Sequence, residues 1–177
     1  MSEEKKEKWT TYMAISTVII VVCATLSTFK GGGYSNKSLM FQTSASDQWA
    51  FYQSKSMKGY NFELQKDNLQ LQSDLVKKTD PDLVPKYQEK IDTYAKKIKQ
   101  YESEKTDIMK KAKDFEALRD DAKLHASAFG IAVIFLQISI LLSSISALSQ
   151  RKYVWFLSLA VGVVGITYFL DGFFLFF

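Results

Sequence analysis

The sequence predicts an all-α membrane protein with three transmembrane helices and a long antiparallel coiled-coil hairpin between the first and the second. Asp, Glu, Lys and Arg are absent from three stretches of 21, 27 and 18 residues, at 9–29, 124–150 and 153–170 of the 177-residue chain. A bilayer-spanning helix needs about 20 predominantly apolar residues. Segment 30–123 instead holds 18 basic and 15 acidic residues. An ordinary soluble enzyme domain is therefore not expected.

The first transmembrane helix is predicted at 9–29, after a charged N-terminal tail at 1–8. Its apolar run reaches spanning length and no small-x-small cleavage site follows it, so an uncleaved anchor is expected rather than a signal peptide. Gly31–Gly33 lie in the next segment, 30–35. Three glycines destabilise a helix by about 1 kcal/mol each relative to Ala. They predict a hinge, with a frayed helix end as the alternative.

The extramembrane hairpin is predicted at 36–125, with two arms of 43 residues that would extend about 65 Å. Lys77 and Lys78 suit the end of the first arm, because cations are favourable at a helix C-terminus. Asp80 and Pro81 are typical of an N-cap and a first helical residue. A capping-box pattern also predicts that the first arm restarts as a helix near Ser44.

The second arm carries a heptad pattern that continues into the second apolar stretch. Apolar residues that repeat with a period of 3.5 along a helix are typical of a coiled coil. The predicted coiled-coil seam consists of Val84, Tyr87, Ile91, Tyr94, Ile98, Tyr101, Ile108, Ala112 and Phe115. Lys105 and Arg119 are its polar exceptions. The first arm has a looser predicted stripe, formed by Trp49, Tyr52, Ser56, Tyr60, Leu64, Leu71 and Leu75.

The second and third transmembrane helices are predicted at 126–148 and 153–170, with a basic loop at 149–152 and an aromatic C-terminus at 171–177. Small and polar residues mediate helix contacts in membranes. The predicted intramembrane helix contacts are Gln137, Ser143, Gly162 and Gly165. Lys and Arg in short flanking segments favour the cytoplasm. They place the N-terminus and the Arg151–Lys152 loop there, with the hairpin on the opposite side.

Residues suited to catalysis or metal binding are scarce. The sequence has no Walker loop, GxGxxG, CxxC or HExxH motif, and it contains one His and one Cys. We therefore expect no enzyme, no catalytic residue, no metal and no cofactor. The basic residues of the hairpin are matched by acids, so nucleic-acid binding is not expected either.

An aromatic cluster in the first arm is the clearest candidate for a docking or packing surface. Trp49 and Tyr52 lie three residues apart, on one helical face, with Gln48 and Gln53 beside them. Trp and Tyr dominate interface energetics. The alternative is a packed seam where the two arms of the hairpin meet, and oligomer packing would satisfy both interpretations.

The order of these segments resembles a known family. The segment Ser46-Asp47-Gln48-Trp49-Ala50-Phe51-Tyr52-Gln53-Ser54-Lys55, followed by a charged coil and LQISILLSSISALSQRKYVW, is similar to bacterial membrane proteins grouped as domain of unknown function 4337. The resemblance covers nearly the whole chain. It implies a multi-pass protein of the bacterial inner (cytoplasmic) membrane, and it implies no activity.

Three functions are consistent with these features. The first is an integral membrane coiled-coil scaffold that self-associates into a homo-oligomer in the lipid bilayer. The second is an accessory subunit of a larger complex, which would bind another membrane protein. The third is a small oligomeric channel or transporter, with Gln137 and neighbouring serines along its path.

Overall fold

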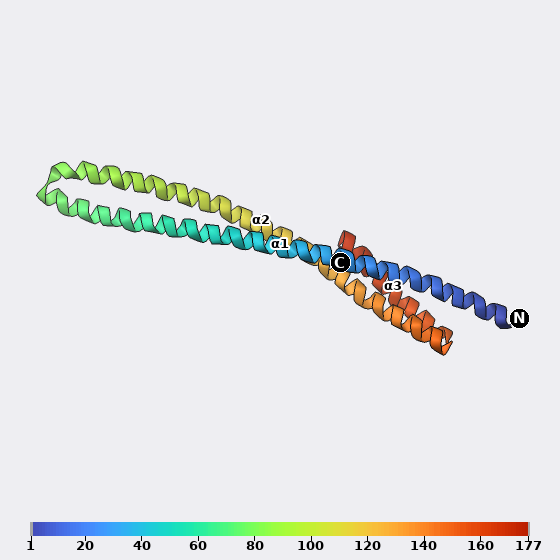
Figure 1. The fold of residues 1–177 in the computed structure, drawn as a ribbon. Helices are drawn as coiled ribbons and strands as arrows, with labels where there is room; N and C mark the ends of the chain where they lie inside the picture. Colours follow the sequence, from blue (N-terminus) through green and yellow to red (C-terminus); the bar gives the residue numbers. More distant parts are fainter. Residues whose placement is uncertain (1, 177) are drawn as a thin grey trace. The chain divides into compact units, whose positions relative to one another are not determined.

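The computed structural model describes residues 2–176 of the chain and consists of helices joined by short turns (Figure 1). Helix α1 is Ser2–Thr79, the short 3-10 helix η1 is Pro81–Leu83, α2 is Val84–Ser149 and α3 is Lys152–Phe174. Met1, Phe177 and the side chains of residues 2–8, which include the predicted charged tail, lie outside the described part.

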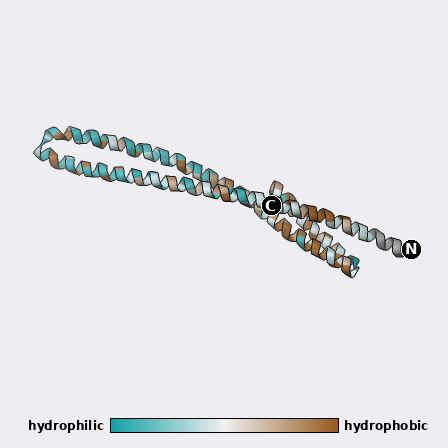
Figure 2. Cartoon of the chain, viewed as in Figure 1, coloured by the Kyte–Doolittle hydropathy of each residue, from teal (hydrophilic) through white to brown (hydrophobic). Residues whose placement is uncertain are grey.

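The chain divides into two units. The three-helix unit is Met1–Met40 with Leu118–Phe177, and the hairpin unit is Phe41–Ala117. Figure 2 shows hydrophobic residues concentrated in the first unit and hydrophilic residues along the second. α1, α2 and α3 each contain a stretch long and apolar enough to cross a membrane. The prediction of a helical protein with three long apolar helices is confirmed.

The glycine run does not interrupt helix α1. The helix is continuous through Gly31–Gly33 and past Ser44, so the predicted break at 30–35 and the predicted restart near Ser44 are wrong. A Cβ on Gly31 would lie 3.0 Å from Cβ of Phe129, which shows how closely α2 packs at this point. Tertiary packing routinely outweighs the roughly 1 kcal/mol cost of a helical glycine.

The reversal between the two arms is short, as the sequence predicts. Lys77 and Lys78 lie in the last turn of α1, and Asp80 takes the N-cap position of η1 with Pro81 directly after it. The Asp80 side chain makes no capping hydrogen bond. Its backbone N–H donates instead to the Val76 carbonyl at 2.7 Å and so closes the last turn of α1.

Two residues with left-handed backbone mark the ends of α2 and α3. Gln150 has φ 51° in the turn before α3, and Leu175 has φ 50° after it. The Leu175 N–H donates to the Asp171 carbonyl at 2.7 Å, and the Phe176 N–H donates to Oδ1 of Asp171 at 2.6 Å. The buried Asp171 carboxylate therefore terminates α3.

Candidate functional site

The hairpin unit contains a heptad face on α2 that is shielded from solvent. All residues of the predicted seam are buried or half-buried, and Ile91, Ile108 and Ala112 are the most buried at 7%, 6% and 0% exposure. Lys105 is half-buried as well. The shielded face of α2 therefore follows the 3.5-residue period of the sequence.

The face of α1 that packs against α2 differs from the predicted stripe. Its buried or half-buried residues also repeat every three or four positions, but most are small or polar: Ala45, Gln48, Tyr52, Lys55, Gly59, Phe62, Lys66, Leu69, Ser73 and Val76. A Cβ on Gly59 would lie 3.9 Å from Cβ of Tyr101. Small residues on α1 therefore make room for aromatic residues on α2.

The predicted stripe of α1 is correct only at its first residues. Trp49, Tyr52 and Ser56 are half-buried, whereas its other members are exposed. Together with Met57 they form a surface that we call the outer stripe. Its residues and exposed fractions are Met57 65%, Tyr60 64%, Leu64 64%, Leu71 64% and Leu75 70%.

The predicted Trp49 surface packs mainly within the hairpin. The Trp49 indole Nε1 donates a hydrogen bond to Oε1 of Glu116 at 2.9 Å, and its ring meets Tyr52 edge-on at 5.6 Å between centroids. Gln48 is half-buried, and Gln53 is exposed. Within one chain, Trp49 and Tyr52 thus join α1 to α2.

A lysine from α1 enters the seam between aromatic rings. Nζ of Lys55 lies 5.3 Å from the ring centroids of both Phe51 and Tyr101, and 2.5 Å from Oε2 of Glu104. The hydrogen bond from Lys55, reinforced by one from Gln100, lowers the pKa of the Glu104 carboxyl below its ordinary value. The ion pair therefore favours a charged Glu104 in the folded hairpin.

Lys105 occupies the polar position of the α2 seam in a similar way. Its Nζ lies 5.5 Å from the Tyr52 ring centroid and 2.7 Å from Oε1 of Glu102. The hydrogen bond to Glu102 raises the pKa of the Lys105 ammonium. Cation–π contacts and nearby carboxylates thus accommodate both seam lysines.

In the three-helix unit, glycines of α3 allow close contact with α2. A Cβ on Gly162 would lie 2.9 Å from Oγ of Ser139, and a Cβ on Gly165 would lie 2.8 Å from Cγ and Cδ2 of Leu136. Both distances are below ordinary van der Waals contact, which begins near 3.4 Å. Gly162 and Gly165, both predicted as helix contacts, lie in this interface.

Serines connect the helices of this unit by hydrogen bonds. Oγ of Ser139 donates to the Ser158 carbonyl at 2.7 Å, and Oγ of Ser158 donates to the Ser139 carbonyl at 2.8 Å. The predicted contact residue Ser143 shares a 2.5 Å hydrogen bond with Thr17 of α1. Gln137 is exposed in a single chain, so its predicted helix contact stays a prediction.

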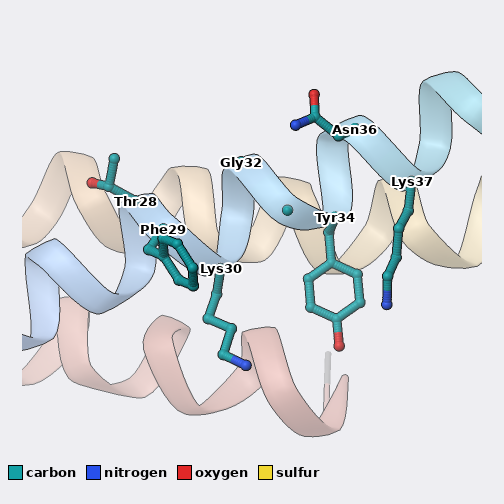
Figure 3. Close-up of a pocket in the computed structure, with 8 residues that line it drawn as sticks. Thr28, Phe29, Lys30, Gly32, Tyr34, Asn36 and Lys37 are labelled. Atoms are coloured by element: carbon teal, nitrogen blue, oxygen red, sulfur yellow. The ribbon is translucent and has the colours of Figure 1, made fainter.

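A groove on α1 begins where the first apolar run ends. It has a volume of about 540 Å³ and is lined by Thr28, Phe29, Lys30, Gly32, Gly33, Tyr34, Asn36 and Lys37. Figure 3 shows the side chains of Lys30, Tyr34 and Lys37 projecting to one side of the helix, with Thr28 and Asn36 projecting to the other. The predicted sites do not include this groove, although the two lysines beside the glycine run are visible in the sequence.

Aromatic and polar contacts hold one side of this groove in place. The Tyr34 ring stacks on His125 of α2 with 4.4 Å between centroids, and Nδ1 of His125 lies 2.8 Å from the Gly172 carbonyl of α3. Tyr34 and His125 therefore join all three helices of the unit. Among the residues that the structure describes, no group of three or more His, Cys, Asp or Glu side chains could hold a metal ion.

Comparison with known proteins identifies a family. The chain has no match among curated proteins or solved structures. A family model described as Domain of unknown function (DUF4337) matches residues 9–175, which covers all three helices apart from the first residues of α1. The match confirms the resemblance noted from the segment Ser46–Lys55 and the spans that follow. The chain belongs to the DUF4337 family.

Proposed function

We propose that this protein is an integral membrane scaffold that self-associates into a homo-oligomer through its hairpin. The three apolar helices would lie in the bilayer, and α1 and α2 would form an antiparallel coiled coil outside it. The role is one of assembly and requires no catalytic residue. The three apolar stretches support the membrane location by their length and composition.

The outer stripe is the observation that carries the proposal. Its five large apolar side chains are each at least 64% exposed. On α2 within the hairpin unit, by contrast, no large apolar side chain among the described residues is exposed, and Leu83 of η1 is 36% exposed. A row of large exposed apolar side chains on a charged helix is typical of an interaction surface, although Asn61 and Asn68 interrupt this one. Phe51 of α1 is also exposed, at 48%, but most of the exposed large apolar side chains of the hairpin unit belong to the outer stripe.

The spacing of the outer stripe favours pairing with a second copy. Met57, Leu64 and Leu71 recur every seven residues, and Asn61, Asn68 and Leu75 form the alternating series three or four positions away. These are the d and a positions of a heptad repeat, and Asn at a specifies register in parallel coiled-coil dimers. Copies inserted in one membrane with one topology run parallel. The two α1 helices would thus pair in register.

Gln137 supports self-association independently of the outer stripe. It lies in the apolar stretch of α2, where it is exposed on a single chain. A polar side chain that faces lipid is costly, and polar side chains in membranes commonly bond across helices. A second copy would supply the partner that one chain lacks.

Cysteine crosslinking in native membranes tests the proposal. Cys23 is first replaced by Ala, and single cysteines are then placed by Leu64→Cys or Leu71→Cys. Both should yield a crosslinked dimer of the chain with a short bifunctional maleimide. Lys99→Cys is the matched control, because it is exposed on α2 near the level of Leu64 and lies outside the outer stripe. Equal crosslinking at Lys99 would overturn the proposed interface.

The mass of the gently extracted complex gives a second measurement. The scaffold predicts an assembly of this chain alone, which a Leu64→Gln, Leu71→Gln double variant would dissociate while its helix content stays unchanged. A strictly monomeric wild-type chain would refute self-association. Recovery of a second protein in fixed stoichiometry would identify the chain as an accessory subunit instead.

We also propose the bacterial inner membrane as the location, with the N-terminus and the Arg151–Lys152 loop in the cytoplasm. The basic residues of these short segments support that orientation. In whole cells with a permeabilised outer membrane, an impermeant thiol reagent should label Lys99→Cys and spare Lys152→Cys. The reverse pattern would invert the topology.

A further inference from the structure

The face of α1 beside the groove carries two cations. Lys30 and Lys37 are seven residues apart, about 10.5 Å along the helix, so they lie two turns apart on one side. Tyr34 lies between them, and all three side chains project in the same direction (Figure 3). A Lys-Tyr-Lys row offers two positive charges and a hydroxyl donor to one anion.

No ion pair within 4.0 Å joins Lys30 or Lys37 to a carboxylate of the residues that the structure describes. Nζ of Lys30 lies 5.9 Å from the Phe173 ring centroid, and Nζ of Lys37 lies 5.3 Å from that of Tyr34. No Asp or Glu occurs between Glu7 and Asp47 in the sequence. Lys55 in the hairpin, by contrast, is paired with Glu104. On α2, Oδ2 of Asp121 lies 3.9 Å from Nε2 of the His125 ring that stacks on Tyr34. Two lysines thus stand beside one carboxylate, and an external anion can balance the remaining positive charge.

The groove also has room for a ligand and an apolar border. Nothing lies within 4 Å of a Cβ built on Gly32 or Gly33, so no other residue covers the helix surface at these two positions. On the side of the apolar run, Phe29 is 77% exposed and Leu26 is 46% exposed. Cationic and hydroxyl groups thus lie directly beside exposed apolar surface.

We propose that the groove at Lys30, Tyr34 and Lys37 binds the phosphate headgroup of an anionic phospholipid. The inference rests on the proposed membrane insertion, because Lys30 is the first charge after the apolar run of α1 and would lie at headgroup level. The lysines attract the phosphate, Tyr34 donates a hydrogen bond to it, and Phe29 contacts the acyl chains. A soluble phosphate would leave that apolar border uncovered.

The test uses the full chain purified in mild detergent and binding of phosphatidylglycerol or phosphatidylcholine measured by native mass spectrometry. Wild type should retain phosphatidylglycerol in preference to phosphatidylcholine. Each basic residue near an anionic surface contributes about 1 kcal/mol, so Lys30→Gln with Lys37→Gln should weaken phosphatidylglycerol binding about 30-fold. Lys86→Gln with Lys90→Gln removes the same charge from exposed positions of the hairpin and should leave binding unchanged.

Three outcomes would overturn the inference. The first is that both double variants weaken phosphatidylglycerol binding equally. The second is that wild type shows no preference for phosphatidylglycerol over phosphatidylcholine. The third is that inorganic phosphate, at the same concentration as the lipid, displaces phosphatidylglycerol. Alkaline carbonate extraction of native membranes separates this failure from that of the scaffold. A chain that resists extraction but shows no lipid preference loses only the headgroup site, whereas a chain that is washed off the membrane is not an integral membrane protein.

Discussion

Gly165→Ala tests the close packing of α3 on α2. The added Cβ would lie 2.8 Å from Cγ and Cδ2 of Leu136 and 3.0 Å from its backbone nitrogen. A leucine side chain can rotate away, but a backbone atom cannot. The methyl group therefore pushes the two helices apart and weakens the contacts that Gly165 now permits.

The expected magnitude follows from comparison with a second glycine. Overpacking a well-packed interface typically costs about 1–3 kcal/mol. Alanine also favours a helix over glycine by about 1 kcal/mol, which offsets part of this loss. Gly130→Ala gains the same propensity in the apolar stretch of α2 but meets nothing within 4 Å. Gly165→Ala should therefore be less stable than Gly130→Ala by about 1–3 kcal/mol.

The assay is equilibrium unfolding of the detergent-solubilised chain by SDS, followed by circular dichroism and tryptophan fluorescence. Both variants and wild type are measured under one set of conditions, so the difference between the two alanines cancels the propensity contribution. Equal free energies of unfolding for Gly165→Ala and Gly130→Ala would refute the close contact between α3 and α2.

Two further predictions concern the ion pair of the hairpin and the serine pair of the three-helix unit. Because Lys55 lowers the pKa of Glu104 in the folded state, the pair stabilises the hairpin above the ordinary carboxyl pKa of 4.5 and loses this contribution as the pH falls below it. Glu104→Gln should thus lower the thermal midpoint at pH 7 and reduce its further fall in acid. Ser139→Ala removes the hydrogen bond to the Ser158 carbonyl and should cost about 0.6 kcal/mol, and at most about 1.7, in SDS unfolding.

Exposed residues provide the control variants for Glu104→Gln and Ser139→Ala. Glu63→Gln removes an exposed carboxylate that makes no ion pair within the described residues, so its midpoint should follow that of wild type at every pH. Ser144 bonds only to the Ile140 carbonyl of its own helix and is exposed, so Ser144→Ala should leave the free energy of unfolding nearly unchanged. An acid response of Glu104→Gln that equals wild type, or a loss for Ser144→Ala as large as for Ser139→Ala, would contradict these assignments.

Much of α2 and of the turn could be predicted because their signals are local. The seam from Val84 to Phe115 repeats with a helical heptad period, and Asp80-Pro81 marks the reversal. The apolar stretches are defined by the absence of charge. Each of these patterns is formed by residues that are close in the sequence, so it can be recognised without knowing the three-dimensional structure.

The packed face of α1 could not be predicted from hydropathy. Ala45, Gly59 and Ser73 are buried, while Leu64 and Leu71 are exposed. A small residue is selected here by the volume of the aromatic side chain opposite, and one sequence does not reveal which residues lie opposite. The apolar stripe is real, but it lies on the other side of the helix.

The course of the helix at the glycine run and the orientation of Gln137 could not be predicted, for related reasons. Propensity predicts a break at Gly31–Gly33, but Phe129 packs against Gly31 and the helix continues. Gln137 has the polarity expected of a helix contact. The direction in which its side chain points depends on the rotation of α2 about its axis, which hydropathy does not determine. Such features depend on which residues meet in three dimensions.

The packed faces of α1 and α2 differ in composition, and this difference determines how two copies could exchange arms of the hairpin. The α1 seam is mostly small or polar and the α2 seam is mostly aromatic or branched, so each fits the other better than it fits itself. An exchanged dimer, in which α1 of one copy packs on α2 of another, would keep every contact of the closed hairpin. Only the short reversal at Asp80 distinguishes the two forms. Lengthening that reversal would favour closure within one chain. The exchanged form would still have to reverse at Asp80, because a straight chain would separate the apolar stretches of α1 and α2 and one bilayer could not hold both.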